Sequence, residues 1–104
     1  MENRDKELLI GMLDFAVRIE KRVACASKDD FMSDLDIQDA VLYAIGQLGE
    51  KVSHLSEEFL EKYPEKDWYV LKGLRNRIFH AYEDIDISLI YNITVQNNKN
   101  TIKC

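Results

Sequence analysis

Residues 36–54, DIQDAVLYAIGQLGEKVSH, decide the fold of this chain. Apolar side chains recur in this stretch at steps of three and four, which is the spacing of one face of an α-helix. The stretch therefore predicts a helix from about Asp36 to His54 with one face in the core. Its apolar stripe consists of Ile37, Val41, Ile45, Leu48 and Val52, with Ala40 and Ala44 beside it.

Two glycines, Gly46 and Gly49, lie inside this predicted helix. A glycine in a helix interior costs about 1 kcal/mol relative to alanine. Close approach of another backbone would account for that cost, so we expect a tight helix crossing here. The alternative is that both glycines are incidental on an exposed face.

The same apolar spacing predicts helices on both sides of this stretch. One runs from about Asp5 to Ala26, and the polar residues 27–34, SKDDFMSD, are expected to connect it to the next. A short helix opens at Ser56 and must stop before Pro64. Two more follow, one capped by Asp67 and one capped by Asp86 after the acidic turn EDID, and the tail from Asn97 is expected to fray.

Breakers of secondary structure are scarce, with four glycines and one proline in 104 residues. This scarcity favours long helices over a turn-rich β architecture. Helices joined by short connections form an up-and-down bundle. We therefore expect one all-α domain over residues 1–104, built from four to five helices.

The composition limits where the chain acts and what it binds. No apolar run is long enough to span a membrane, and the charged N-terminus, MENRDKELLIG, has no signal-peptide pattern. We expect a cytoplasmic protein with no membrane partner, in which Cys25 and Cys104 are reduced thiols. The net charge of −5 argues against a nonspecific nucleic-acid binder, so any RNA chemistry requires a local basic patch.

The segment with the most chemical information is Leu71 to Asp86, LKGLRNRIFHAYEDID. In it Arg75 is followed, after four intervening residues, by His80, and Tyr82 comes two residues later. An imidazole exchanges protons near neutral pH, and a guanidinium holds phosphate oxygens with planar paired donors. These are the groups that RNA cleavage without a metal requires: a base for the ribose 2′-hydroxyl, an acid for the leaving oxygen and a cation for the phosphate.

Helical geometry constrains how these side chains can cooperate. At 100° per residue, Arg75 and Tyr82 would be nearly eclipsed with Phe79 beside them, whereas His80 would lie about 140° from Arg75 on the side of Asn76. One narrow face therefore cannot aim both Arg75 and His80 at a small target. Either the helix ends near His80 and redirects it, or two copies of the helix meet across a two-fold axis.

The extended pattern resembles that of HEPN domains of the HepT-like family. The arginine, histidine and tyrosine of the segment carry this resemblance, together with Gly49-Glu50, Tyr63-Pro64 and Trp68. The resemblance implies a metal-independent endoribonuclease toxin that acts as a homodimer with a composite site between the subunits. It also implies a separately encoded MNT-type nucleotidyltransferase antitoxin that attaches AMP to Tyr82.

Roles follow for each residue of the expected site. Arg75 and His80 are the expected catalytic residues, with Tyr82 as the site of modification. In a shared groove, the cations of two copies would supply the basic patch that the acidic chain otherwise lacks. Supporting or RNA-phosphate contacts are expected from Lys72, Asn76, Arg77 and Glu50, the last as a carboxylate that orients Arg75 or Arg77.

No cofactor and no metal site are expected. The cysteines and histidines have no ligand-pair spacing, and the chain has no glycine-rich phosphate loop.

Structural interpretations of the same residues remain open. Arg75 could pair with the acidic turn at Glu83-Asp84, His80 could cap a helix C-terminus, and Tyr82 could be a core tyrosine. Asn76 could equally be a solvated polar residue. On those readings the chain would be a non-catalytic accessory subunit of a nucleotidyltransferase, or a helical scaffold without chemistry.

Overall fold

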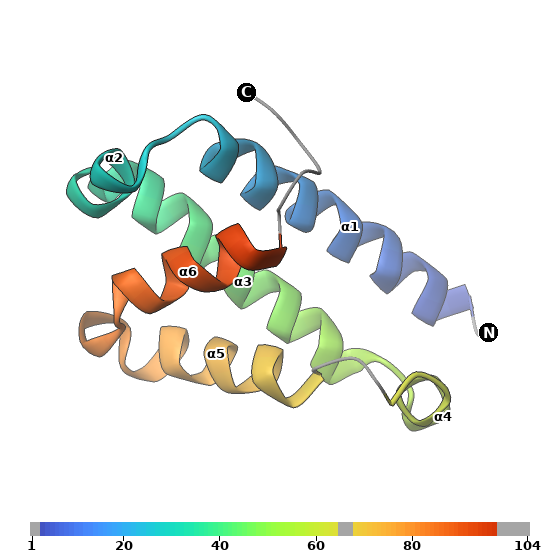
Figure 1. Ribbon diagram of the computed structural model, residues 1–104. Helices are drawn as coiled ribbons and strands as arrows, with labels where there is room; N and C mark the ends of the chain where they lie inside the picture. Colours follow the sequence, from blue (N-terminus) through green and yellow to red (C-terminus); the bar gives the residue numbers. More distant parts are fainter. Residues whose placement is uncertain (1–2, 65–67, 98–104) are drawn as a thin grey trace.

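The computed structural model describes residues 3–64 and 68–97, and within these ranges the chain contains helices and no strand. The helices pack as an all-α bundle (Figure 1). Asp67 and the tail beyond Asn97, on which predictions were made, lie outside the described residues. The helices are α1 (Asn3–Ala24), α2 (Lys28–Ser33), α3 (Leu35–His54), α4 (Glu57–Lys62), α5 (Trp68–His80) and α6 (Ile87–Asn97), with a 3₁₀ turn η1 (Tyr82–Asp84) before α6.

Helix α3 is the centre of the bundle, with α1 along one side and α5 along the other (Figure 1). Helix α6 lies across it, in the gap between α1 and α5. The apolar stripe predicted from residues 36–54 faces this core, since Val41, Ile45 and Val52 are buried and Ile37 and Leu48 pack at its edge. The predicted all-α bundle is therefore confirmed.

The predicted tight crossing is also confirmed, and it joins α3 to α5. A side chain on Gly49 would place its Cβ 2.4 Å from the Cβ of Arg75 and 2.5 Å from the carbonyl oxygen of Leu71. At Gly46 the corresponding position is 3.2 Å from the ring of Phe79. A Cβ essentially never occupies the space at Gly49, and one at Gly46 would require the Phe79 ring to shift slightly, so the two glycines let α5 approach α3 closely.

The prediction that residues 27–34 form a plain connection is wrong, because Lys28–Ser33 form helix α2. Ser27 and Asp30 make a reciprocal capping box at its start, with Asp30 N–H donating to Ser27 Oγ at 3.0 Å. Phe31 is fully buried and fixes the short helix to the core. Two adjacent apolar residues in six, of which only Phe31 is buried, are too weak a pattern to predict a helix from sequence.

The start of helix α4 is tied to the start of helix α1 by a contact between Ser56 and Asp5. Ser56 caps it as predicted, accepting from Phe59 N–H at 3.2 Å. The buried carboxylate of Asp5 accepts from the backbone N–H and the hydroxyl of Ser56, at 3.0 and 2.6 Å. These bonds lower the pKa of Asp5 below its ordinary value.

Two further features bear on the sequence predictions. In the described part of the chain, no helix is long and apolar enough to cross a membrane. Cys25 is disulfide-bonded, so the expectation of a reduced thiol there is wrong. The expected cellular compartment and the sequence spacing do not determine the redox state of a cysteine, which is why this prediction failed.

Candidate functional site

The motif occupies the C-terminal half of α5 and the turn that follows it. The helix ends at His80 because Ala81 leaves helical geometry, with φ −145° and ψ 43°. Tyr82 then begins the 3₁₀ turn η1. The expectation that Tyr82 lies eclipsed over Arg75 on one helix is therefore wrong, since the helical register is broken between them.

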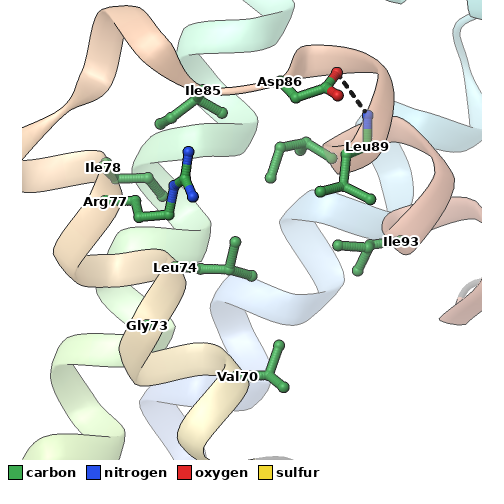
Figure 2. Close-up of a pocket in the computed structure, with 10 residues that line it drawn as sticks. Val70, Gly73, Leu74, Arg77, Ile78, Ile85, Asp86, Leu89 and Ile93 are labelled. Atoms are coloured by element: carbon green, nitrogen blue, oxygen red, sulfur yellow. Dashed lines mark hydrogen bonds between the residues drawn. The ribbon is translucent and has the colours of Figure 1, made fainter.

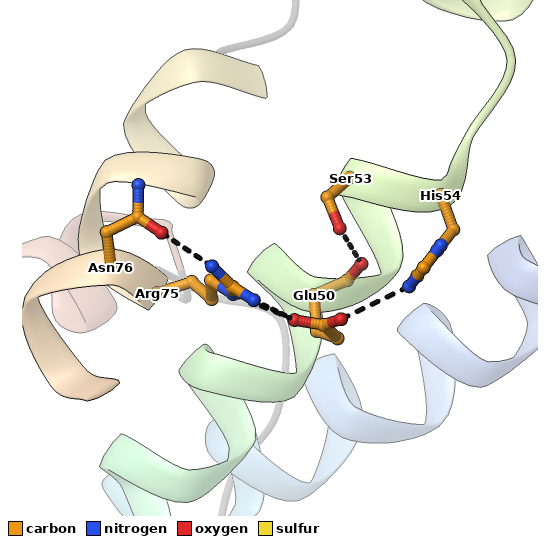
Figure 3. Close-up of polar contacts among 5 residues, drawn as sticks. All are labelled: Glu50, Ser53, His54, Arg75 and Asn76. Carbon is orange, nitrogen blue, oxygen red and sulfur yellow. Dashed lines mark hydrogen bonds and ion pairs between the residues drawn. The ribbon is translucent and has the colours of Figure 1, made fainter. Parts of the chain in front are cut away.

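Arg75 is fixed on the side of α5 that faces α3. Its Nε and Nη2 both approach Oε2 of Glu50, at 2.8 and 2.6 Å, and its Nη1 donates to Oδ1 of Asn76 at 2.7 Å (Figure 3). The crossing at Gly49, the residue before Glu50, brings the two side chains within reach. Of the alternatives open in the sequence, pairing with Glu50 replaces pairing with the Glu83-Asp84 turn.

These contacts leave part of the guanidinium available. A guanidinium has five N–H groups, and three of them donate to Glu50 and Asn76. One N–H remains on each terminal nitrogen, Nη1 and Nη2. The arginine side chain is 28% exposed, so this edge can meet a solvent-borne anion.

Glu50 connects Arg75 to a second histidine, His54. Its Oε1 lies 3.1 Å from Nε2 of His54, one turn along α3 (Figure 3). The bond from Arg75, followed by that from His54, lowers the pKa of the Glu50 carboxyl. The carboxylate is thus held in its charged form between two basic groups. No functional role was predicted for His54, although its spacing of four from Glu50 could have indicated the pair.

Two aromatic rings on α5 each make a cation–π contact with a basic side chain of the same helix. The guanidinium carbon of Arg75 lies 4.7 Å from the ring centre of Phe79, and Nζ of Lys72 lies 6.0 Å from that of Tyr69. Both rings are exposed to solvent, Tyr69 to 87%. Basic and aromatic groups therefore alternate on this side of the helix.

Arg77 lies elsewhere. It lines an apolar groove of 490 Å³ between α5 and α6, where Asp86 caps α6 by accepting from Leu89 N–H at 3.2 Å (Figure 2). On an α-helix Arg77 is 200° from Arg75. The structure thus brings Lys72, Arg75, Asn76 and Glu50 together and does not bring Arg77 to them.

His80 is exposed at the last position of α5. Within residues 3–64 and 68–97 its imidazole has no hydrogen bond or ion pair, so none joins it to Arg75. A histidine at a helix C-terminus interacts favourably with the helix dipole when it is charged. The geometry therefore allows a proton-transfer role and a capping role alike.

Tyr82 is anchored to the opposite end of α3 from Glu50. Its hydroxyl donates to Oδ1 of Asp39, a residue that sequence reasoning missed. Burial of the hydroxyl and then the bond to Asp39 raise the pKa of Tyr82 to about 12, although the residue as a whole is 43% exposed. Asp39 and Glu50 are eleven residues apart, which is about 16 Å along a helix. No signal in the sequence could have linked Asp39 to Tyr82, 43 positions away.

Within the described ranges, no group of three or more His, Cys, Asp or Glu side chains is placed to hold a metal ion.

Comparison with known proteins gives a consistent set of relatives. The family model described as "Ribonuclease HepT-like" matches residues 12–103. "Putative RNase MJ1380" of Methanocaldococcus jannaschii is 30% identical over 93% of this chain and 90% of that protein. "Putative RNase MJ0127" of the same organism is 35% identical over 72% of this chain and 62% of that protein.

A relative from another organism, "Probable ribonuclease HepT" of Thermococcus cleftensis, is 25% identical over 88% of this chain and 83% of that protein. No solved structure matches the chain significantly. The family match spans most of the chain, including α3, α5 and the turn with Tyr82. The chain therefore belongs to the HepT-like ribonuclease family.

Proposed function

We propose that this protein is a metal-independent endoribonuclease in which Arg75 and His80 act on one phosphodiester. The observation that carries the proposal is the state of Arg75. Glu50 and Asn76 hold its guanidinium in place while one N–H on each terminal nitrogen remains available. A preorganised, partly exposed donor pair of this kind matches two oxygens of a phosphate.

In the proposed reaction, one imidazole removes the proton from a ribose 2′-hydroxyl. The 2′-oxygen bonds to phosphorus, the bond to the 5′-oxygen breaks, and a second imidazole donates a proton to that leaving oxygen. Arg75 balances the charge that develops on the non-bridging oxygens. The products are a 2′,3′-cyclic phosphate and a 5′-hydroxyl. Positioned proton transfer of this type typically contributes about 10²- to 10⁴-fold.

The proposal requires a homodimer. His80 lies about 140° around α5 from Arg75, so one copy cannot point both side chains at the same phosphate. If the C-terminal ends of two α5 helices meet across a two-fold axis, the arginine of one copy can face the histidine of the other. Two copies would also bring Lys72 and Arg75 of each chain to one cleft. This local positive charge would offset the net negative charge of the chain.

Regulation is proposed to act at Tyr82. A nucleotidyltransferase antitoxin would transfer AMP to its hydroxyl, making the chain the toxin of a toxin–antitoxin pair in the cytoplasm. The acceptor hydroxyl must first leave Asp39. Because Tyr82 follows the end of α5, the added phosphate would lie beside His80 at the mouth of the site and exclude RNA by occupancy and repulsion.

A second candidate function is a non-catalytic accessory subunit of a nucleotidyltransferase. It is favoured by the extent to which Arg75 is already satisfied, since three of its five N–H groups are bonded within the chain. The net charge of −5 also favours it.

Growth on induction separates the two functions. We expect the wild type to arrest growth of a bacterial host, and Arg75→Ala and His80→Ala to be tolerated at equal protein levels. Arrest that persists in both variants would refute the nuclease assignment. Co-expression with the nucleotidyltransferase should add one AMP on Tyr82, detected by peptide mass spectrometry, and an adduct on another residue would refute the proposed regulation.

A further inference from the structure

Helix α5 differs in charge from the rest of the chain. Its thirteen residues, WYVLKGLRNRIFH, include Lys72, Arg75, Arg77 and His80 and no acidic residue. The whole chain carries 19 acidic residues against 14 lysines and arginines. Among the described helices, α5 alone combines basic side chains with the absence of any carboxylate, since α6 has neither. The helix that carries the candidate site therefore has a charge complementary to a polyanion.

The solvent-facing stripe of α5 runs from Tyr69 to His80. Tyr69 and His80 are eleven residues apart, so they point in nearly the same direction about 16 Å apart. Between them, at steps of three and four, lie Lys72, Gly73 and Asn76. The stripe thus begins with the aromatic ring of Tyr69 and ends at the imidazole of His80, the candidate acid–base group. Between them it presents a cation, an uncovered stretch of backbone and an amide.

Gly73 has no explanation within this chain. A Cβ added there would meet no atom within 4 Å, unlike one at Gly49 or Gly46. Glycine in the middle of a helix costs about 1 kcal/mol relative to alanine. The absence of a side chain keeps the centre of the stripe flat, which suits a ligand that runs along the helix surface.

A hollow of 260 Å³ lies beside Tyr69 at the start of the stripe. It is lined by Leu60, Glu61, Pro64, Trp68, Tyr69 and Lys72. Trp68 is fixed in place, since its ring N–H donates to the carbonyl of Tyr63 at 3.0 Å and its ring lies 6.0 Å from that of Phe59. An aromatic wall with a lysine at its rim suits one unstacked nucleobase and its phosphate, and Glu61 can accept from an exocyclic amine.

We propose that this stripe is a track for single-stranded RNA, in which Tyr69 stacks one base, Lys72 contacts the adjoining phosphate, and the strand continues over Gly73 and Asn76 to His80. The Arg75 guanidinium, which donates to Asn76, lies at the edge of this track. The inference rests on the proposed nuclease function and names its substrate class. Bases in a duplex are already stacked and cannot use such a platform, whereas unpaired bases stack on aromatic side chains without sequence preference. Because His80 ends the helix, a two-fold pair joined at the His80 ends leaves both Tyr69 ends outward.

The test measures binding in a His80→Ala background, which removes cleavage. A short fluorescein-labelled oligoadenylate is titrated as a single strand and as a duplex with oligouridylate, by fluorescence anisotropy. We expect preference for the single strand, a loss of at least about fivefold on Tyr69→Leu, and recovery with Tyr69→Phe, which keeps the ring. Duplex affinity should be unchanged by either substitution.

The matched control is Tyr43→Leu, which removes a 60% exposed ring from α3 that packs edge-on against Phe15 at 6.0 Å. It should leave single-strand affinity intact. Equal losses in the two leucine variants, or no loss on Tyr69→Leu, would overturn the track. So would dissociation of the dimer on Tyr69→Leu, measured by light scattering, because the ring would then belong to a protein interface.

The outcomes also separate the track from the nuclease proposal. Cleavage by the wild type without dependence on Tyr69 would refute the track alone. Single-strand binding that depends on Tyr69, in a protein that never cleaves RNA, would refute the nuclease alone.

Discussion

On each side of α5 a glycine and an arginine lie close together, but the two sides differ in how tightly they are packed. On the side facing α3, Gly49 leaves no room for a side chain and Arg75 is clamped by Glu50 at 2.6 and 2.8 Å. On the far side, Gly73 has open space above it and Arg77 lies along an apolar groove. The difference shows that a cation becomes a positioned donor only where packing and a carboxylate partner fix it.

The largest expected effect is the difference in RNA cleavage rate between substitutions of Arg75 and of Arg77, the two arginines of α5. Arg75→Ala removes the positioned donor pair, and we expect RNA cleavage to fall by about 100-fold or more, the typical cost of one such donor in a transition state. Arg77→Ala changes a residue on the far side, so we expect less than about a tenfold loss. Initial rates on a labelled RNA, with melting curves to check folding, measure both.

Equal losses from the two substitutions would contradict the distinction between the sides. Arg75→Lys refines the test, because it keeps the charge and loses the planar fork. We expect it to resemble Arg75→Ala in rate more than it resembles the wild type.

The two glycines provide the next comparison, on stability. Gly49→Ala would force a Cβ against Arg75 and the Leu71 carbonyl, and overpacking of this kind costs about 1–3 kcal/mol. Because α5 must move away from α3, the Arg75–Glu50 pair should weaken as well. The free energy of unfolding, from urea denaturation, measures the loss.

Gly73→Ala is the matched control in the same bundle. With nothing near its Cβ, it should stabilise the protein by up to about 1 kcal/mol through helix propensity alone. A stabilising Gly49→Ala, or a strongly destabilising Gly73→Ala, would show that the side facing α3 is not the crowded one.

The smallest expected effect concerns Tyr82. Its pKa of about 12 should fall toward the ordinary value of 10 in Asp39→Asn, where the charged acceptor is lost and burial remains. A raised pKa stabilises the folded protein below pH 10, and this contribution disappears as the pH rises through 12. Tyrosinate absorbance titrations, with Tyr82→Phe subtracted, isolate this residue. Identical titrations of wild type and Asp39→Asn would show that Asp39 does not contribute to the raised pKa of Tyr82.

The helices that the sequence predicted well are those with long apolar stripes. Residues 36–54 met this condition, and the glycines inside them marked the real crossing with α5. Helix α2 was missed because its formation depends on Phe31 being buried by the rest of the fold. A local pattern cannot carry that information.

The candidate site was predicted in part for a related reason. Residue types along α5 indicated Arg75 and His80. Glu50 was expected to orient Arg75 or Arg77, and the structure pairs it with Arg75. The predicted register of Tyr82 was wrong because the helix ends at His80, two residues before Tyr82. Ala81 leaves helical geometry through backbone angles that no residue pattern indicated. Asp39 was invisible because only the packing of α5 against α3 brings it to Tyr82.

The most direct test of the account is cleavage of a single-stranded RNA in the presence of EDTA, with the products analysed at their ends. We expect the wild type to produce 2′,3′-cyclic phosphate and 5′-hydroxyl ends. We expect His80→Ala, still dimeric by light scattering, to lose at least about 100-fold in cleavage rate. Cleavage at the wild-type rate by His80→Ala, or cleavage that EDTA abolishes, would contradict it.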